Sequence, residues 1–354
     1  MLSRRDFLHR FFLYTLSLYA GGSALSACSP RETPPPIIPT STMPPSPTAT
    51  NTLSPTGVPY GAPPPTAAAT TTLTRVPPSP TPFQPYLSVA HGPSPSAITR
   101  AAIDTLGGIG RFVKKGDDVI IKPNICNASL KPELASTTNP EVVATLVTLC
   151  LDAGAKRVRV MDQPFSGTAV EAYKTSGIRD AVERAGGQME IMSDMKYVTT
   201  SFPQGRDIKS WKVYEDILKA DVLINVPVAK THDLAKLTLA MKGLMGVIPN
   251  ANRSAFHNSI DQRIADLNTV VHPTLNVVDA VRVVVRNGPT NWNPANVVVA
   301  NTVIASHDVV AADAYAAKTL FQRQPQEIGY IRLGGEMGIG KYDLQNMVIK
   351  EVSV

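Results

Sequence analysis

Short apolar runs alternate with longer segments of helical periodicity along the chain beyond residue 86. Runs rich in Val and Ile predict strands at 118–121, 157–161, 222–226, 275–278, 297–300 and 347–352. Apolar residues at helical spacing predict helices at 96–106, 140–153, 178–185, 237–244, 259–268 and 309–321. Strands and helices that alternate in this way are typical of βαβ units. The pattern therefore predicts an α/β fold in which a mostly parallel sheet carries helices on both faces.

The first residues have the layout of an export signal. Ser3-Arg4-Arg5-Asp6-Phe7-Leu8 places two arginines before an apolar stretch, which ends at Leu25-Ser26-Ala27-Cys28. The stretch is shorter than the roughly 20 apolar residues that span a bilayer, so a signal peptide cleaved after residue 27 is favoured over an uncleaved anchor. Leu-Ser-Ala-Cys resembles the bacterial lipobox, which implies a lipidated Cys28. We expect an exported protein that Cys28 anchors to the outer face of a cell-envelope membrane.

Residues 28–85 have a composition that is unsuited to a packed core. More than half of the 31 prolines of the chain fall here, mixed with Thr, Ser and Ala. Too little apolar surface is present to offset the entropy of ordering the chain, and the proline runs favour extended, semi-stiff segments. We predict a disordered Pro/Thr/Ser-rich tether, with a ligand for a partner module as the alternative. Residues 86–354 then form a single α/β domain.

Charge and cysteine content narrow the possible partners. The formal net charge is +6, and removal of the charges of the signal peptide leaves (34−3)−(28−1) = +4. Basic residues are scattered rather than clustered, which argues against nucleic acid as a partner. No Cys-x-x-Cys spacing occurs, so neither an iron–sulfur cluster nor structural zinc is expected. Cys126 and Cys150 either pair in an oxidising compartment or remain small buried thiols.

Polar side chains follow several predicted strands directly. These side chains are Lys122 and Asn124 after the first strand, Asp162 after the second, Lys230 and His232 after the third, and Asp279 after the fourth. In open parallel sheets the carboxyl ends of the strands meet at one edge, where ligands bind. Each residue alone is more often part of a solvated loop than catalytic. Together they predict a shared cleft that contains lysine, histidine and aspartate.

Several motifs, taken in their order along the chain, carry a resemblance to a known family. They are Lys122-Pro123-Asn124, the segments 138–143, 152–156 and 220–227, Lys230-Thr231-His232, Lys242-Gly243-Leu244-Met245-Gly246, Asn287-Gly288-Pro289-Thr290, Ala305-Ser306-His307-Asp308 and Ala312-Asp313-Ala314. In this order they resemble the bacterial and archaeal domain-of-unknown-function family numbered 362, over most of residues 119–321. The resemblance implies a fold but no established reaction.

This chain departs from that family at three places. It lacks the ferredoxin-like four-cysteine module that some relatives carry. It has Met241-Lys242-Gly243 where relatives more often have Lys-Asn, and His307-Asp308-Val309 where Asp-Asp-Pro or a similar sequence is common. These departures leave a redox role and the detailed ligand set open.

The chemistry of the candidate residues indicates what the cleft can bind. Lys230 and Lys242 offer point charges for a carboxylate or phosphate, while His232 and His257 suit acid/base catalysis or metal binding near neutral pH. For His257, a hydrogen-bonded structural role is the alternative. The remaining candidates are carboxylates that orient these groups or bind a hard cation, and they are Asp162, Asp279, Asp308 and Asp313. One of the last two could instead cap a helix.

Three classes of function are consistent with these residues. The leading hypothesis is an enzyme or an enzyme-like domain that holds a small anionic molecule or a metal ion for proton transfer. The alternative is a non-catalytic surface receptor in which the same side chains bind a ligand without turnover. A purely structural tethered module is the third hypothesis.

Overall fold

The computed structural model describes residues 86–354. The signal peptide over residues 1–27, the lipidated Cys28 and the tether over residues 28–85 lie outside the described residues. In residues 86–354, no helix combines the length and the apolar character that crossing a membrane requires.

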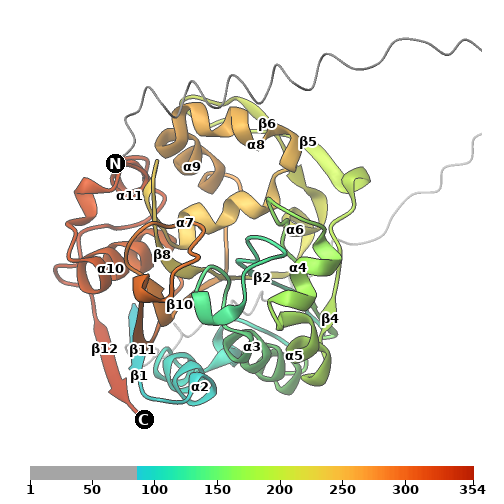
Figure 1. The fold of residues 1–354 in the computed structure, drawn as a ribbon, viewed down its shortest axis with the longest axis vertical. Helices are drawn as coiled ribbons and strands as arrows, with labels where there is room; N and C mark the ends of the chain where they lie inside the picture. The colour runs from blue at the N-terminus through green and yellow to red at the C-terminus, as the bar shows by residue number, and fades with distance from the viewer. Residues whose placement is uncertain (1–85) are drawn as a thin grey trace, which may run out of the picture. The chain divides into compact units, whose positions relative to one another are not determined.

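A large mixed sheet forms the centre of the domain (Figure 1). Its strand order is β12 (Ile349–Ser353), β1 (Leu87–His91), β11 (Val297–Ser306), β10 (Leu275–Val284), β7 (Val222–Val226), β2 (Asp118–Pro123), β3 (Arg157–Val160) and β4 (Gln188–Met189). The strands β10, β7, β2, β3 and β4 run parallel, whereas β11 is antiparallel to both of its neighbours. β8 (Val228–His232) pairs parallel with β10 and antiparallel with β9 (Lys236–Thr238).

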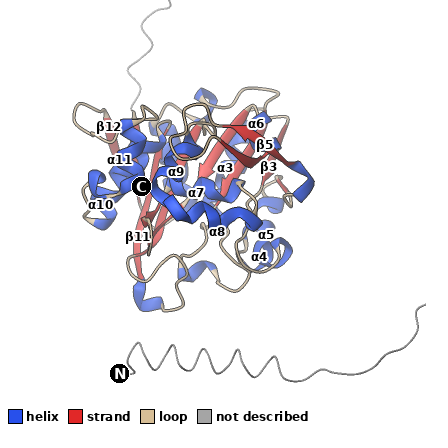
Figure 2. Ribbon diagram, turned by 90° about the horizontal axis from the view of Figure 1, so that it is seen from above, coloured by secondary structure: helices blue, strands red, loops and turns tan. Residues whose placement is uncertain are grey.

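Helices cover both faces of the sheet (Figures 1 and 2). One face carries α2 (Pro95–Thr105), α3 (Pro140–Asp152), α4 (Ala169–Thr175) and α5 (Ile178–Arg184). The other carries α6 (Glu215–Lys219), α7 (Ala240–Gly243), α8 (Arg253–Phe256), α9 (Ile260–Asn268), α10 (Val309–Phe321) and α11 (Gly329–Glu336). Alternation along β2 sends Val119 and Ile121 into the first core and Ile120 into the second. The predicted fold class is confirmed.

A separate two-stranded hairpin, β5 (Tyr197–Ser201) and β6 (Ser210–Tyr214), stands beside the main sheet. The sequence analysis did not predict this hairpin, nor did it predict β1, which joins two strands from the end of the chain. The glycine-rich segment that contains Gly334 and Gly335 lies in helix α11.

The segment that precedes the candidate site differs from its prediction. The helix predicted over 237–244 is wrong, since β9 occupies its first part and the short helix α7 begins only at Ala240. A 3-10 turn, Leu244–Val247, follows α7 at once. The residues predicted as a loop after β7 form strand β8, which places Lys230 and His232 inside a strand. Lys236, with a φ of 62°, is the first residue of β9, directly after the turn that leads from β8.

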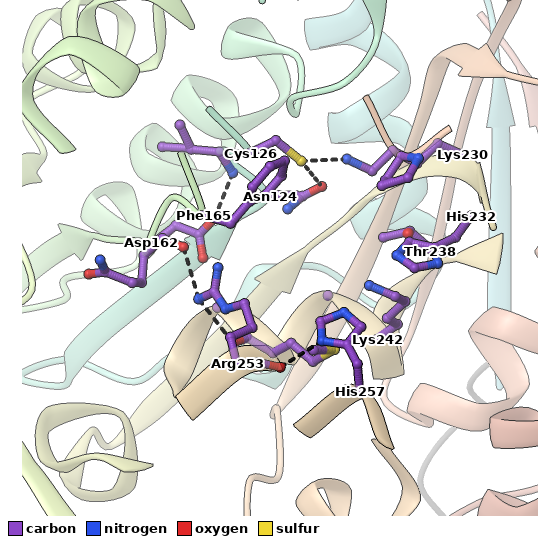
Figure 3. Close-up of a pocket in the computed structure, with 16 residues that line it drawn as sticks. Asn124, Cys126, Asp162, Phe165, Lys230, His232, Thr238, Lys242, Arg253 and His257 are labelled. Carbon is purple, nitrogen blue, oxygen red and sulfur yellow. Dashed lines mark hydrogen bonds between the residues drawn. The ribbon is translucent and has the colours of Figure 1, made fainter. Parts of the chain in front are cut away.

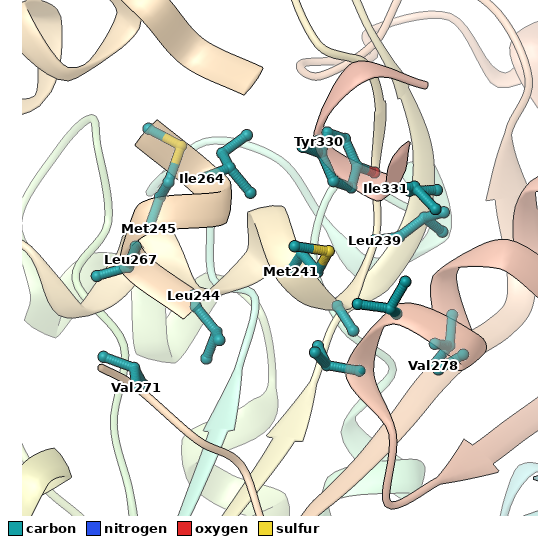
Figure 4. Close-up of a cluster of buried hydrophobic side chains, with 14 of the residues drawn as sticks. Leu239, Met241, Leu244, Met245, Ile264, Leu267, Val271, Val278, Tyr330 and Ile331 are labelled. Atoms are coloured by element: carbon teal, nitrogen blue, oxygen red, sulfur yellow. The ribbon is translucent and has the colours of Figure 1, made fainter. Parts of the chain in front are cut away.

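Apolar packing fixes α7 and the turn after it in place (Figure 4). Met241, Leu244 and Met245 are buried there in one cluster with Ile264 and Leu267 of α9. Burial of a single Leu or Met side chain stabilises a fold by about 1.5–3 kcal/mol. The backbone that carries Lys242 is therefore held by a well-packed core.

Candidate functional site

A cavity of about 230 Å³ opens where the carboxyl ends of β2 and β3 meet β8 and α7. Its polar lining comprises Asn124, Cys126, Asp162, Gln163, Lys230, His232, Thr238, Lys242, Arg253 and His257. Figure 3 shows the lysine and histidine side chains converging on this space from different elements. The volume is below the roughly 300–1,000 Å³ that is typical of drug-sized ligands, so the ligand that fits is small.

Lys122 and Asp162 form a buried ion pair next to the cavity. Lys122 Nζ lies 2.6 Å from Asp162 Oδ1, and Lys122 is 1 % exposed. The other oxygen of Asp162 accepts a hydrogen bond of 2.6 Å from the backbone N–H of Ile125. Lys122 itself does not line the cavity. The carboxylate of Asp162 is thus neutralised by a lysine below the cavity, which leaves it little capacity to neutralise the cations around the cavity.

Lys230 is directed at the thiol of Cys126. Its Nζ donates at 2.7 Å to Cys126 Sγ and at 2.7 Å to the carbonyl of Ser136. The thiol donates in turn to Asn124 Oδ1 at 3.6 Å. Cys126 and Cys150 are both free, so no disulfide joins them. The sequence analysis did not select Cys126 as a site residue, because nothing in its local sequence indicates a lysine that follows 104 positions later.

The two histidines of the cavity have different tautomers. Nδ1 of His232 receives the backbone N–H groups of Leu234 and Ala235, both at 3.2 Å, so it is an acceptor and the proton lies on Nε2. Nδ1 of His257 lies 2.6 Å from the carbonyl of Arg253, which can only accept, so this nitrogen carries the proton. The neutral rings therefore offer a donor, His232 Nε2–H, and an acceptor, His257 Nε2.

Both histidines are neutral at physiological pH. Burial, together with the positive charges of Lys242 and Lys230, lowers the pKa of His232 to about 2. Burial also lowers the pKa of His257, although its hydrogen bond to the carbonyl of Arg253 opposes that change. The rings are nearly parallel, with centroids 6.4 Å apart. A bound molecule that contacts both rings meets one hydrogen-bond donor and one acceptor.

Lys242 projects from α7 into the cavity (Figure 3). Its residue is 9 % exposed, and in the described part of the chain its amine has neither a hydrogen bond nor an ion pair. Burial and the nearby charge of Lys230 lower the pKa of Lys242 to about 7. This lysine is therefore close to half neutral at pH 7, unlike a solvated lysine with a pKa of about 10.4.

Arg253 completes the cationic lining and was not selected from the sequence. Its Nη2 donates to the carbonyls of Gln163, Met245 and Ile248 at 3.2, 3.4 and 3.3 Å. Its Nε is buried without a hydrogen-bond partner in residues 86–354. A buried, partly unsatisfied guanidinium is costly unless an anion offsets its charge.

The charges around the cavity are unbalanced. Within residues 86–354, no carboxylate forms an ion pair with Lys230, Lys242 or Arg253, and Asp162 is paired with Lys122. The described residues contain no group of three His, Cys, Asp or Glu side chains that is suited to a metal ion. The lining is thus complementary to an anion rather than to a cation.

Three predicted ligand-binding carboxylates, Asp279, Asp308 and Asp313, do not line the cavity. Asp279 lies inside β10 and accepts the backbone N–H groups of Asn139 and Val281. Asp308 caps α10, as the sequence analysis allowed for one carboxylate of this pair. Asp313 accepts the N–H groups of Ala240 at 2.6 Å and Met241 at 2.9 Å. These carboxylates are already satisfied by backbone amides, so their role in the described structure is to hold helix ends and strands.

The other predicted site residues do come together. Lys230, His232, Lys242 and His257 all line the cavity, with Asn124 and Asp162, and Lys122 lies beneath it through its ion pair. They are brought there by β8, by α7, by the turn after α8 and by the ends of β2 and β3.

The fold and the site define an α/β domain with a small, cation-lined pocket. Residues 119–318 match the family described as domain of unknown function (DUF362), and the chain belongs to this family. It is 28% identical over 214 residues to the thylakoid-associated protein sll1697 of Synechocystis, a match that covers 57% of this chain and 63% of that protein. The chain thus spans less than two thirds of the length of this curated relative.

Two solved structures match part of the chain. The lactate racemase apoprotein from Thermoanaerobacterium thermosaccharolyticum superposes with a TM-score of 0.42 and 14% identity, covering 62% of this chain and 54% of that one. A protein from Thermotoga maritima superposes with a TM-score of 0.35 and 12% identity, covering 53% of this chain and 51% of that one.

Proposed function

We propose that the pocket binds a small anionic molecule, a carboxylate or phosphate of few atoms, that His257 exchanges a proton with it, and that His232 donates a hydrogen bond to it. The observation that carries this proposal is the set of three buried or half-buried cations, Lys230, Lys242 and Arg253, without a carboxylate partner in residues 86–354. Buried cations are stabilised only when an anion or hydrogen-bond acceptors replace the water they lose. A bound anion supplies that charge.

The size of the cavity and the histidine tautomers also support the binding of a small anion. A volume of about 230 Å³ accommodates an anion of a few heavy atoms. The Nε2–H of His232 donates to an anionic oxygen, while the bare Nε2 of His257 accepts from a hydroxyl or removes a proton. A neutral His257 with a bare Nε2 can act as a general base, while the Nε2–H of neutral His232 polarises the ligand through a hydrogen bond.

Anion binding is tested by the thermal unfolding of the full chain in acetate and in inorganic phosphate at constant ionic strength. A ligand that binds only the folded state stabilises it by about 2.7 kcal/mol at a hundred times its Kd. We expect the midpoint to rise with either anion in the wild type and in Lys212→Met, a variant of an exposed lysine on β6. We expect no rise in Lys230→Met. An equal rise in Lys230→Met, or none in the wild type, contradicts the proposal.

The acid/base pair is tested with glycolate, which is acetate with one added hydroxyl. Because the Nε2 of His257 is an acceptor, His257→Phe should remove the gain in affinity of glycolate over acetate and leave the affinity for acetate unchanged. Because His232 donates to the anion, His232→Phe should weaken both ligands. A non-catalytic receptor gives the same binding results, and it is separated from an enzyme by turnover of the bound molecule. Equal losses for both ligands in His257→Phe contradict the assigned tautomer.

We further propose that the domain is exported and attached to a membrane through lipidated Cys28. The support is the order of twin arginines, apolar stretch and lipobox in residues 1–28. The Cys28→Ser variant should move from the membrane fraction to the soluble fraction, whereas Cys150→Ser should not. Retention of Cys28→Ser on membranes contradicts this proposal.

A further inference from the structure

We propose that Lys242 forms an imine with a carbonyl group of the ligand, so that the pocket takes a small oxo-acid. This inference rests on the proposed function for the carboxylate of the ligand and adds a covalent step at a residue of the cavity. It follows from the unequal surroundings of the three lysines at the site.

Of these three lysines, only one has an amine without a hydrogen-bond or ion-pair partner within residues 86–354. Lys122 is engaged by Asp162 and by the carbonyl of Pro123, and Lys230 by Cys126 and by the carbonyl of Ser136. The amine of Lys242 has no such partner within residues 86–354 and faces the cavity. A nucleophilic amine needs a free lone pair, and such a pair is available at Lys242 alone among the three.

The backbone under Lys242 is rigidly held. Asp313 accepts the N–H groups of Ala240 and Met241 at the start of α7, and Met241 is fully buried. Figure 4 shows Met241 and Leu244 pointing into the cluster of apolar side chains, on the same short segment as Lys242. A preorganised amine reaches an electrophile without reorganising its surroundings.

The basic side chains have different roles in binding and in reaction. Lys230 and Arg253 remain cations that hold the carboxylate of an oxo-acid. Their positive charge, added to burial, lowers the pKa of Lys242 to about 7, so that a large fraction of this amine is neutral at pH 7. Placing a lysine in an apolar site beside another cation is a recognised way to make it nucleophilic.

The histidines supply the proton transfers of the step. The lone pair of Lys242 Nζ attacks the carbonyl carbon, the C–O π pair moves to oxygen, and the amine passes one proton to the bare Nε2 of His257. His232 Nε2–H donates a hydrogen bond to the carbonyl oxygen. That oxygen takes up the proton held by His257 and then the second N–H proton of the carbinolamine, again by way of His257. The C–O bond breaks as water leaves, and the nitrogen lone pair forms the C=N bond. One amine and one ketone give one imine and one water, with no change of oxidation state.

The test is reductive trapping of the full chain with pyruvate and sodium borohydride, followed by peptide mass spectrometry. We expect a carboxyethyl group on the peptide that contains Lys242, at a level on the order of tenfold or more above exposed lysines, because their amines are almost fully protonated at pH 7. Acetone, which has the ketone without the carboxylate, should label Lys242 much less. Lys242→Arg, which keeps the charge without a nucleophile, should lose the label, while Lys212→Met should keep it.

The site of labelling in the wild type decides the outcome even if a variant fails to fold. Labelling of Lys242 that needs both pyruvate and borohydride supports the imine. Its absence, or equal labelling of all lysines, overturns the imine. If acetate or phosphate stabilises the chain but Lys242 is not trapped, only the imine is wrong. If pyruvate and acetone label Lys242 equally and neither acetate nor phosphate stabilises the chain, the proposed anion binding is wrong. The reaction of Lys242 with a carbonyl group is then supported without it.

Discussion

Replacing Lys242 with Met should stabilise the folded domain, because it removes a charge that the fold buries without a partner. The pKa of Lys242 falls from an ordinary 10.5 to about 7 in the folded domain. At about 1.4 kcal/mol for each factor of ten, this difference of 10.5 − 7 = 3.5 corresponds to roughly 5 kcal/mol. Contact of the amine with the open cavity lowers that value, so we expect a gain of about 2–4 kcal/mol in the free energy of unfolding.

The gain should depend on pH with a definite sign. Above the unfolded pKa of 10.5 both states hold a neutral amine, and the substitution has no electrostatic effect. Between 10.5 and about 7 the unfolded chain binds a proton that the folded domain does not, so the wild type loses stability as the pH falls. Below about 7 both states are charged and the gain reaches its full, constant value.

Urea unfolding of the full chain, followed by circular dichroism at several pH values, measures this difference. The free energy of unfolding of Lys242→Met minus that of the wild type should rise as the pH is lowered from about 10 to about 7 and then level off. Lys212→Met, which removes an exposed lysine, should show no such trend. A destabilised Lys242→Met, or a difference that is the same at every pH, would show that Lys242 is not a destabilising buried charge.

Two further substitutions test how the site is built. A Cβ at Gly246 would overlap Asp162 Oδ1 and Lys122 Nζ, so Gly246→Ala should break the buried ion pair and lower the free energy of unfolding by about 3–5 kcal/mol. Gly110→Ala, whose Cβ meets nothing within 4 Å, should have little effect. Equal effects of the two substitutions in urea unfolding contradict this. Asp313→Asn replaces one of two acceptors for the first amides of α7 and should lower the free energy of unfolding by about 1–3 kcal/mol in the same assay. An unchanged unfolding midpoint would show that these two hydrogen bonds contribute nothing to stability.

The fold was largely predictable because its strands are apolar on both faces and its helices have clear ends. β2 and β7 coincide with runs rich in Val, Ile and Leu, and α10 occupies the predicted range 309–321. The short helix α7 is harder to predict from the sequence, because no neighbouring residue caps it with its side chain. The segment at 236–243 mixes strand and helix because pairing with β8 and burial against α9 decide its conformation, and neither is visible in local sequence.

The candidate site was predictable where chemistry follows strand ends, and not where contacts are distant in sequence. Lys230, His232 and Asp162 were found from the polar residues after apolar runs. Asp279 was misplaced because β10 continues to Val284, and a carboxylate is tolerated inside a strand once backbone amides satisfy it. Cys126 entered the site through its contact with Lys230, which links residues 104 positions apart.

Uncompensated positive charge faces the pocket, and the thiol of Cys126, 2.7 Å from Lys230 Nζ, is placed to report it. Iodoacetate and iodoacetamide alkylate the same thiolate but differ in charge, so the ratio of their rates at Cys126, read by peptide mass spectrometry, isolates the electrostatic attraction. Cys150 is an internal control, since burial raises its pKa to about 12. We expect the ratio at Cys126 to be well above that of glutathione and to fall when phosphate is added. A ratio equal to or below that of glutathione, or an unreactive Cys126, contradicts it.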